Sequence, residues 1–187
     1  MIAAALLAAG RSSRMGRSKA LIHLQGRAIV DVLADTYRAA GLDRLVVVAS
    51  GEVLSHLLER DDLELVRGDP AQPMIDSVAR ALEVLESADA LVVQPVDAPF
   101  TTVPMLEALT DGREDLCRVL CHQGRAGHPV LVPRASFSRI AERPRGGLRA
   151  VLAEHEVELV EWPDARILAD LDTPEDLARW TDLVRLH

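Results

Sequence analysis

Short apolar runs alternate with amphipathic segments along most of the chain. The first run, residues 2–8, is apolar on both alternating faces, and three further short runs predict strands: residues 45–49, 63–66 and 90–96. Four segments between or after them carry apolar positions at helical spacing: residues 28–40, 53–60, 74–85 and 103–109. Strands that are apolar on both faces are typical of a parallel sheet covered by helices on either side. The alternation therefore predicts an α/β fold with a doubly wound, mostly parallel sheet of the Rossmann type.

The pattern changes after residue 110. Residues 116–122 and 129–132 flank a glycine-containing turn and predict a β-hairpin, which we interpret as a small insertion in the α/β fold. The remaining elements are a helix at 148–155, a strand at 157–161 and a final helix at 173–186. Thr173, Pro174 and Asp176 give this last helix an N-cap, a proline in the first turn and a capping box.

Composition narrows the class of protein. The chain has 187 residues, near the usual size of one domain, and shows no internal repeat or linker, so we expect a single domain over 1–187. Apolar residues make up 49% and aromatic residues 3%, which predicts a folded chain with a layered aliphatic core. With 29 acidic and 21 basic residues the net charge is -8, and this sign disfavours nucleic acid as a partner.

Location and redox state follow from the apolar runs and the cysteines. Residues 1–9 form the longest apolar run, about half of what spans a bilayer, and no basic stretch precedes it. We therefore expect a cytoplasmic protein with no membrane partner. Cys117 and Cys121 lie four positions apart in a predicted strand, about 13 Å at strand rise and too far for a disulfide.

The loop after the first strand has the composition of a phosphate site. Sheets of this class bind ligands beyond the carboxyl ends of their strands. From Gly10 to Lys19, both included, the chain carries two glycines, three serines and four cations. Glycines permit close backbone approach to an anion and the cations neutralise it. The spacing does not fit a P-loop, because five residues separate Gly10 from Gly16 and Lys19 comes three residues after Gly16. A Rossmann fingerprint, G-x-G-x-x-G, is absent.

A solvated basic loop is the alternative, and one residue argues against it. The chain has twenty arginines and a single lysine, Lys19, in this glycine-rich loop. Because every other basic residue is an arginine, the lysine at position 19 indicates a specific role there. Its compact ammonium group suits a site that binds phosphate.

The same segment resembles the signature of the MobA-like nucleotidyltransferases, which transfer CMP or GMP to molybdopterin. It reads LAAGRSSRMGRSK, and the resemblance continues in PVDAP near residue 97, GHPVL near 128 and DLDTPEDL near 172. It implies the nucleotidyltransferase fold. It also implies the roles of six residues: base and ribose contacts from Ala8, Ala9 and Gly10, triphosphate contacts from Arg14 and Lys19, and a further nucleotide contact from Ser77. Ala9 stands where guanylyl-transferring members have glycine, so the resemblance favours CTP over GTP.

Carboxylates at the strand ends supply a candidate metal site. Asp97 follows the strand at 90–96 directly, and Thr102 is better placed than Asp97 to cap the next helix, so we interpret Asp97 as a metal ligand. Spacing alone leaves both Asp170 and Asp172 open as second ligands or as helix-dipole partners. The resemblance selects Asp172. Two carboxylates facing a triphosphate suit Mg²⁺.

Two further positions concern the acceptor. His128 begins an apolar strand, and we expect it to face solvent there, although the matching family position lies near the acceptor. Arg145-Gly146-Gly147 resembles a glycine-containing loop of the family but has arginine where aspartate is usual.

These features lead to one expected reaction. An acceptor phosphate oxygen attacks the α-phosphorus of an NTP in line and pyrophosphate leaves, with Asp97 and Asp172 holding Mg²⁺ and with Lys19 and Arg14 on the pyrophosphate. Molybdopterin is the first acceptor implied by the resemblance, and a sugar or alditol phosphate is the alternative. A different class remains open: a nucleotide-binding accessory protein that delivers a cofactor without turnover. In either class a molybdoenzyme apoprotein is the partner to expect.

Overall fold

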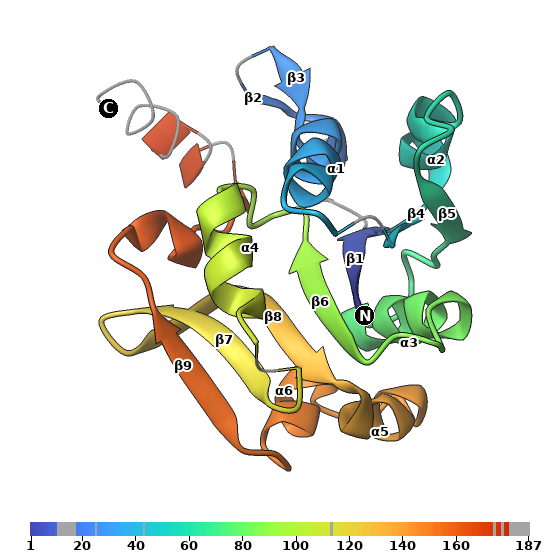
Figure 1. The fold of residues 1–187 in the computed structure, drawn as a ribbon. Helices are drawn as coiled ribbons and strands as arrows, with labels where there is room; N and C mark the ends of the chain where they lie inside the picture. The colour runs from blue at the N-terminus through green and yellow to red at the C-terminus, as the bar shows by residue number, and fades with distance from the viewer. Residues whose placement is uncertain are drawn as a thin grey trace.

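The computed structural model describes residues 1–10, 18–24, 26–42, 44–112, 114–173, 175–176 and 178–179. A seven-stranded sheet runs through the middle of the molecule, with helices on both sides (Figure 1). Its strands are β1 (Ile2–Ala8), β4 (Leu45–Ala49), β5 (Glu64–Arg67), β6 (Ala90–Pro95), β7 (Cys117–His122), β8 (Arg125–Pro133) and β9 (Val157–Glu161). A separate two-stranded ribbon is formed by β2 (His23–Leu24) and β3 (Arg27–Ala28). The observed layers confirm the predicted α/β class.

The strand order of the large sheet is β5-β4-β1-β6-β8-β7-β9. β1 pairs in parallel with both β4 and β6, so the carboxyl ends of β1 and β6 lie side by side, with Leu7 opposite Pro95. β8 is the antiparallel member: it pairs with β6 on one side and with β7 on the other. The predicted hairpin therefore forms, but it widens the main sheet instead of standing apart as an insertion.

Helices cover each face of the sheet with an aliphatic layer. The helices are α1 (Ile29–Ala39), α2 (Gly51–Leu57), α3 (Met74–Val84), α4 (Val103–Thr110), α5 (Phe137–Ala141) and α6 (Gly147–Leu152). Three 3₁₀ turns accompany them: η1 (Lys19–Leu21), η2 (Arg134–Ser136) and η3 (Ala165–Leu168). Buried side chains of α1, α2 and α4 form one cluster with the sheet, and those of α3, α5 and α6 form the other. This is the two-faced core that strands apolar on both sides require.

Most predicted elements have their observed counterparts within a few residues. The strands at 2–8, 45–49 and 157–161 are found with the predicted bounds. The helix predicted at 53–60 begins earlier, at Gly51, and ends at Leu57. The short elements α5, η2 and η3 have no counterpart in the prediction, since segments of three to five residues show too little periodicity to be recognised. The helix predicted at 173–186 falls largely outside the described residues.

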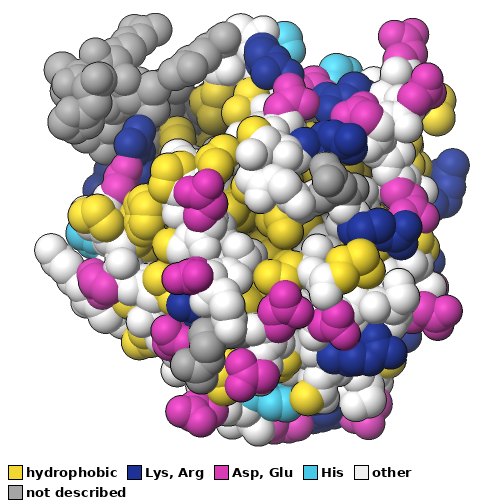
Figure 2. Space-filling view, viewed as in Figure 1, with side chains coloured by type: hydrophobic (Ala, Val, Ile, Leu, Met, Phe, Trp, Pro, Cys, Tyr) yellow, Lys and Arg dark blue, Asp and Glu magenta, His cyan; other side chains and the backbone are white. Residues whose placement is uncertain are grey.

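The surface agrees with a folded acidic protein. On the face drawn in Figure 2, acidic and basic side chains are interspersed around exposed apolar atoms. Within the part of the chain that the structure describes, no helix is both long and apolar enough to cross a lipid bilayer. Cys117 and Cys121 are both buried and both free, as the spacing predicted.

Candidate active site

The loop between β1 and η1 is anchored at both ends. The Ser50 hydroxyl, just before α2, donates a hydrogen bond of 3.1 Å to the carbonyl of Ala9. The backbone N–H of Ser18 donates one of 3.1 Å to the carboxylate of Glu52 in the first turn of α2. Residues 11–17 lie outside the described residues, and with them Arg14, which stays a prediction. The described residues on either side of this segment, Ala9 and Ser18, thus both contact the start of α2.

Ala8 and Ala9 are 2% and 4% exposed at the end of β1, whereas Gly10 is exposed. A Cβ placed on Gly68 would lie 2.4 Å from the Cβ of Ala9, so the two residues pack directly against each other. Glycine at 68 is what leaves room for alanine at 9. Ser77 is 7% exposed in α3, and its predicted role in nucleotide binding stays a prediction.

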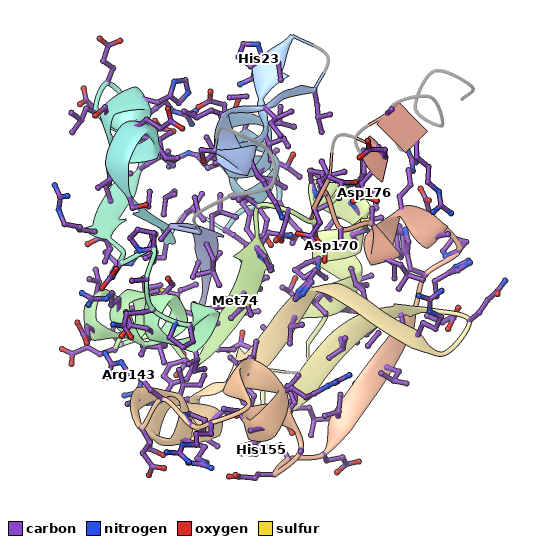
Figure 3. All side chains as sticks on the ribbon, turned by 180° about the vertical axis from the view of Figure 1, so that it is seen from behind. His23, Met74, Arg143, His155, Asp170 and Asp176 are labelled. Atoms are coloured by element: carbon purple, nitrogen blue, oxygen red, sulfur yellow. The ribbon has the colours of Figure 1, made fainter. Side chains whose placement is uncertain are left out.

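Three carboxylates meet beyond the end of β6. Asp97 follows this strand, and Asp170 and Asp172 follow η3, about seventy residues later in the chain; one carboxylate oxygen of each lies within 4.8 Å of those of the other two. The backbone N–H of Leu171 donates a 2.8 Å hydrogen bond to the carbonyl of Asp97, which joins the two segments. Figure 3 shows Asp170 beside the end of β6. The structure thus brings both predicted aspartates together and adds Asp170 to them.

Gly127 in β8 lets the second segment come this close. A Cβ at Gly127 would lie 2.3 Å from the carbonyl oxygen of Ile167 in η3. Any larger residue would push η3, and the aspartates that follow it, away from β8. Gly127 is a site residue that sequence reasoning overlooked, because nothing in a turn-rich stretch distinguishes a glycine needed for close approach from one needed for the turn.

Lys19 lies among these carboxylates. Its Nζ contacts Oδ1 of Asp172 directly and lies 3.5 Å from Oδ2 of Asp97, with the lysine side chain only 12% exposed. Burial opposes its charged form, but the hydrogen bond to Asp172 and the charges of Asp97, Asp172 and Asp170 outweigh burial and raise the pKa of Lys19. The chain's single lysine is therefore a cation at the carboxylate cluster.

The cluster has the chemistry of a divalent-cation site. Burial, followed by the charges of Asp97 and Asp172, raises the pKa of Asp170 to about 6, while Lys19 acts in the opposite direction. Converging carboxylates that repel one another and already attract an ammonium form a donor set that fits Mg²⁺ or Mn²⁺. The residues present thus fit the metal that the sequence suggested.

The predicted helix caps at Thr173 and Thr102 leave the carboxylates of Asp172 and Asp97 free of a capping role. One carboxylate oxygen of Asp176 accepts from the backbone N–H of Asp172 at 3.2 Å and of Thr173 at 2.9 Å, and the Asp176 N–H donates to Oγ1 of Thr173 at 3.1 Å. The predicted capping box is confirmed, and it fixes the backbone that carries Asp172. Thr102 is the N-cap residue of α4 as predicted, although its side chain makes no capping hydrogen bond.

A cavity of about 580 Å³ lies between the β7–β8–β9 part of the sheet and the starts of α3 and α6; its lining includes His128 but none of the three clustered aspartates. Its walls are mainly apolar and include Met74, Val130 and Leu159, while Gly146 and Gly147 border it at α6. Arg143 donates a 2.9 Å hydrogen bond from Nε to Asp76, which ties the segment before α6 to α3. Both Met74 and Arg143 are labelled in Figure 3.

His128 lines this cavity and does not face solvent as expected. It is half-buried in β8, and its Nδ1 is buried without a hydrogen-bond partner among the described residues. Burial lowers the pKa of His128, although the charge of Asp97 acts to raise it. The expectation was wrong because β8 begins earlier than predicted, at Arg125, so that the exposed start of the strand is Arg125 and Ala126 and His128 lies further along it. A buried ring nitrogen without a partner, close to a carboxylate cluster, is suited to contact a ligand.

Comparison with known proteins agrees with this geometry. A family model described as a MobA-like NTP transferase domain matches residues 4–159. The molybdenum cofactor cytidylyltransferase of Escherichia coli strain K12 is 27% identical over 177 residues, with 91% of each chain covered. The molybdenum cofactor guanylyltransferase of Cereibacter sphaeroides is 31% identical over 188 residues, covering 96% of this chain and 95% of that protein.

Two other proteins are similar to this chain over nearly its whole length. The nicotine blue oxidoreductase of Paenarthrobacter nicotinovorans is 29% identical over 195 residues and covers 93% of each chain. The crystal structure of an Rv0371c homologue from Mycobacterium sp. strain JC1 superimposes with a TM-score of 0.85 at 28% identity, covering 100% of this chain and 98% of that one. The superposition shows that the fold is shared over the whole chain.

Proposed function

Since this chain belongs to the MobA-like NTP transferase family, we propose that it transfers CMP, in preference to GMP, from a nucleoside triphosphate to molybdopterin with release of pyrophosphate. The family assigns the chain to the nucleotidyltransferases. The observation that carries the rest of the proposal is the convergence of Asp97, Asp170 and Asp172 with Lys19 at the carboxyl edge of the sheet, next to the anchored first loop.

The protein's part in such a reaction is alignment and neutralisation of charge, because the acceptor oxygen attacks the α-phosphorus in line. Asp97 and Asp172 would hold Mg²⁺, with Asp170 beside them. The bound metal supplies positive charge to the phosphates. Lys19, now paired with the carboxylates, and Arg14 on the first loop would neutralise the leaving pyrophosphate.

The acceptor would occupy the cavity that His128 lines. A volume of about 580 Å³ lies within the usual range for small-molecule sites, roughly 300–1,000 Å³. Its apolar walls suit a planar heterocycle. Of the residues that line it, His128 is close enough to Asp97 for the aspartate charge to act on its ring. The unpartnered Nδ1 of His128 would then meet a polar group of the acceptor.

The preference for CTP rests on Ala9. Its side chain is 4% exposed and packs against Gly68. A base held beside Ala9, as the family resemblance implies, would meet a wall that cannot turn aside. A purine needs more room than a pyrimidine at the same wall, and rigid packing resists the small shift required. We therefore expect the kcat/KM for CTP to exceed that for GTP.

An acceptor panel tests the proposal. Each of the four NTPs is incubated with Mg²⁺ and with molybdopterin, a sugar phosphate or an alditol phosphate, while pyrophosphate and the nucleotidylated product are both measured. We expect product from CTP and molybdopterin above every other pair. Product from a sugar or alditol phosphate alone would reassign the acceptor, and binding of nucleotide without pyrophosphate from any pair would favour the accessory protein over the enzyme.

A further inference from the structure

Gln94 is a polar side chain at a position where the sheet is otherwise apolar. It is 0% exposed in β6, three residues before Asp97, and its strand neighbours Val92 and Val93 are also 0% exposed. A buried amide is costly unless its hydrogen bonds are made, so a glutamine kept in such a strand has a specific use.

Both hydrogen bonds that this amide donates go to the turn that carries Asp97. Nε2 donates to the carbonyls of Pro95 and Ala98, at 2.8 Å each, and so spans the turn from one side of Asp97 to the other. Oε1 accepts from the Thr101 hydroxyl at 2.6 Å and from the Tyr37 hydroxyl at 3.2 Å. Both hydroxyls are buried, and together they orient the amide so that its NH₂ group faces the two carbonyls.

The turn 95–98 also holds the segment 170–172, which carries the other two aspartates. Within the turn, the N–H of Ala98 donates a 3.3 Å hydrogen bond to the carbonyl of Pro95. The carbonyl of Asp97 accepts a hydrogen bond from the N–H of Leu171, which lies between Asp170 and Asp172. A shift of the turn would therefore move the three carboxylates relative to one another. Side chains of a metal site need such outer support to keep their geometry.

We propose that Gln94 is a positioning residue for the carboxylate cluster, acting through the turn 95–98 and, beyond it, through Leu171. The inference rests on the proposed metal site for its effect on catalysis, but the positioning itself is a property of the metal-free protein. The competing explanation is that Gln94 only stabilises the core between α1 and β6.

Gln94→Met is the direct test, since methionine has a similar length and lacks the amide. We expect Mn²⁺ binding, followed by electron paramagnetic resonance, to weaken about tenfold, and kcat to fall about 10²-fold because a displacement of about 1 Å in a reacting group costs that much. The KM for CTP should change less than about threefold. In the metal-free variant, amide hydrogen exchange at Ala98 and Leu171 should become faster. Tyr37→Phe, which leaves Thr101 to hold the amide, should lose only about twofold in Mn²⁺ affinity.

Ile140→Ala is the matched control, because Ile140 is 0% exposed in α5, which packs on the sheet away from this turn. It should lose stability and keep the wild-type Mn²⁺ affinity. If Ile140→Ala weakens Mn²⁺ binding as much as Gln94→Met, the role of Gln94 is only structural and the proposal is wrong. Should Gln94→Met not fold, Gln94→Asn, one methylene shorter, must show the same losses to a smaller degree. Unchanged exchange at Ala98 and Leu171 in a folded variant overturns the proposal whether or not the protein transfers nucleotides.

Discussion

Replacing Lys19 by methionine should change metal binding and catalysis in opposite directions. Methionine keeps much of the length of the side chain and removes the ammonium from among Asp97, Asp170 and Asp172. In the absence of nucleotide, a divalent cation entering this cluster must overcome the repulsion of the ammonium. Without the ammonium the carboxylates are left with unbalanced negative charge, so Mn²⁺ should bind more tightly.

The size of the effect follows from the geometry. At 3.5 Å between Nζ and Asp97, two unit charges interact by about 5 kcal/mol at an effective dielectric constant of about 20. The side chains of Asp97 and Asp172 are 36% and 47% exposed, so solvent reduces this value toward the 1 kcal/mol or less of surface pairs. About 1 kcal/mol corresponds to about fivefold tighter Mn²⁺ binding.

Isothermal titration of Mn²⁺ into nucleotide-free protein measures this change. The same variant should melt at a lower temperature than wild type in EDTA and recover when Mn²⁺ is added, because a bound ligand stabilises the folded state. Its kcat for CMP transfer should fall by about 10²-fold, since a charge directed at the leaving group is lost.

Arg60→Met provides the control for net charge. Arg60 lies among Asp31, Asp35 and Asp62, an equally acidic group formed by α1 and the segment after α2. Its replacement should leave Mn²⁺ affinity unchanged. Weaker or equal Mn²⁺ binding by Lys19→Met would refute the reasoning, because it would mean that the ammonium does not compete for these carboxylates.

Three further predictions concern the same cluster. Lys19→Arg keeps the charge, so it should melt within about two degrees of wild type, yet its broader guanidinium should reduce kcat/KM for CTP by about 10²-fold in steady-state kinetics; an unchanged value would count against a phosphate role. Asp97→Asn should fold normally and lose turnover at every Mg²⁺ concentration tried, and near wild-type activity would exclude Asp97 as a metal ligand. Asp170 has its pKa raised to about 6 from 3.8, so the folded state holds its proton more tightly than the unfolded chain and loses stability as the pH rises from about 4 to 6. Asp170→Asn should therefore melt a few degrees higher than wild type in EDTA at pH 8 and equally at pH 4; equal melting at both values would contradict the shift.

The layers of the fold could be predicted because their signal is local. The apolar runs in β1 and β4 are continuous and that in β6 is interrupted by Gln94; such strands require cover on both faces, which an α/β sheet of this kind provides. The place of β8 could not be predicted in this way. Its antiparallel pairing with β6 depends on contacts between distant segments. The expectation that His128 faces solvent was wrong because β8 starts at Arg125 and because the segment around Gly146, distant in the sequence, lines the same cavity as His128.

In the candidate site, too, single residues could be identified from the sequence but their contacts could not. Asp97 could be identified from its place after a buried strand, and Lys19 from its rarity. Their contact could not, because it joins segments 78 residues apart. Gln94 left a readable signal as the polar residue of an apolar strand, but the meaning of that signal, the two carbonyls on either side of Asp97, exists only in the folded chain.

The most direct test of the central claim is the stoichiometry of a single reaction. Wild-type protein is mixed with CTP, molybdopterin and Mg²⁺, and pyrophosphate and cytidylylated molybdopterin are quantified in the same samples over time. Nucleotidyl transfer predicts that the two products appear at equal rates, that both vanish when molybdopterin is omitted, and that neither forms with Asp97→Asn. Pyrophosphate that forms equally without molybdopterin, or a nucleotide that binds and is recovered intact, would contradict it.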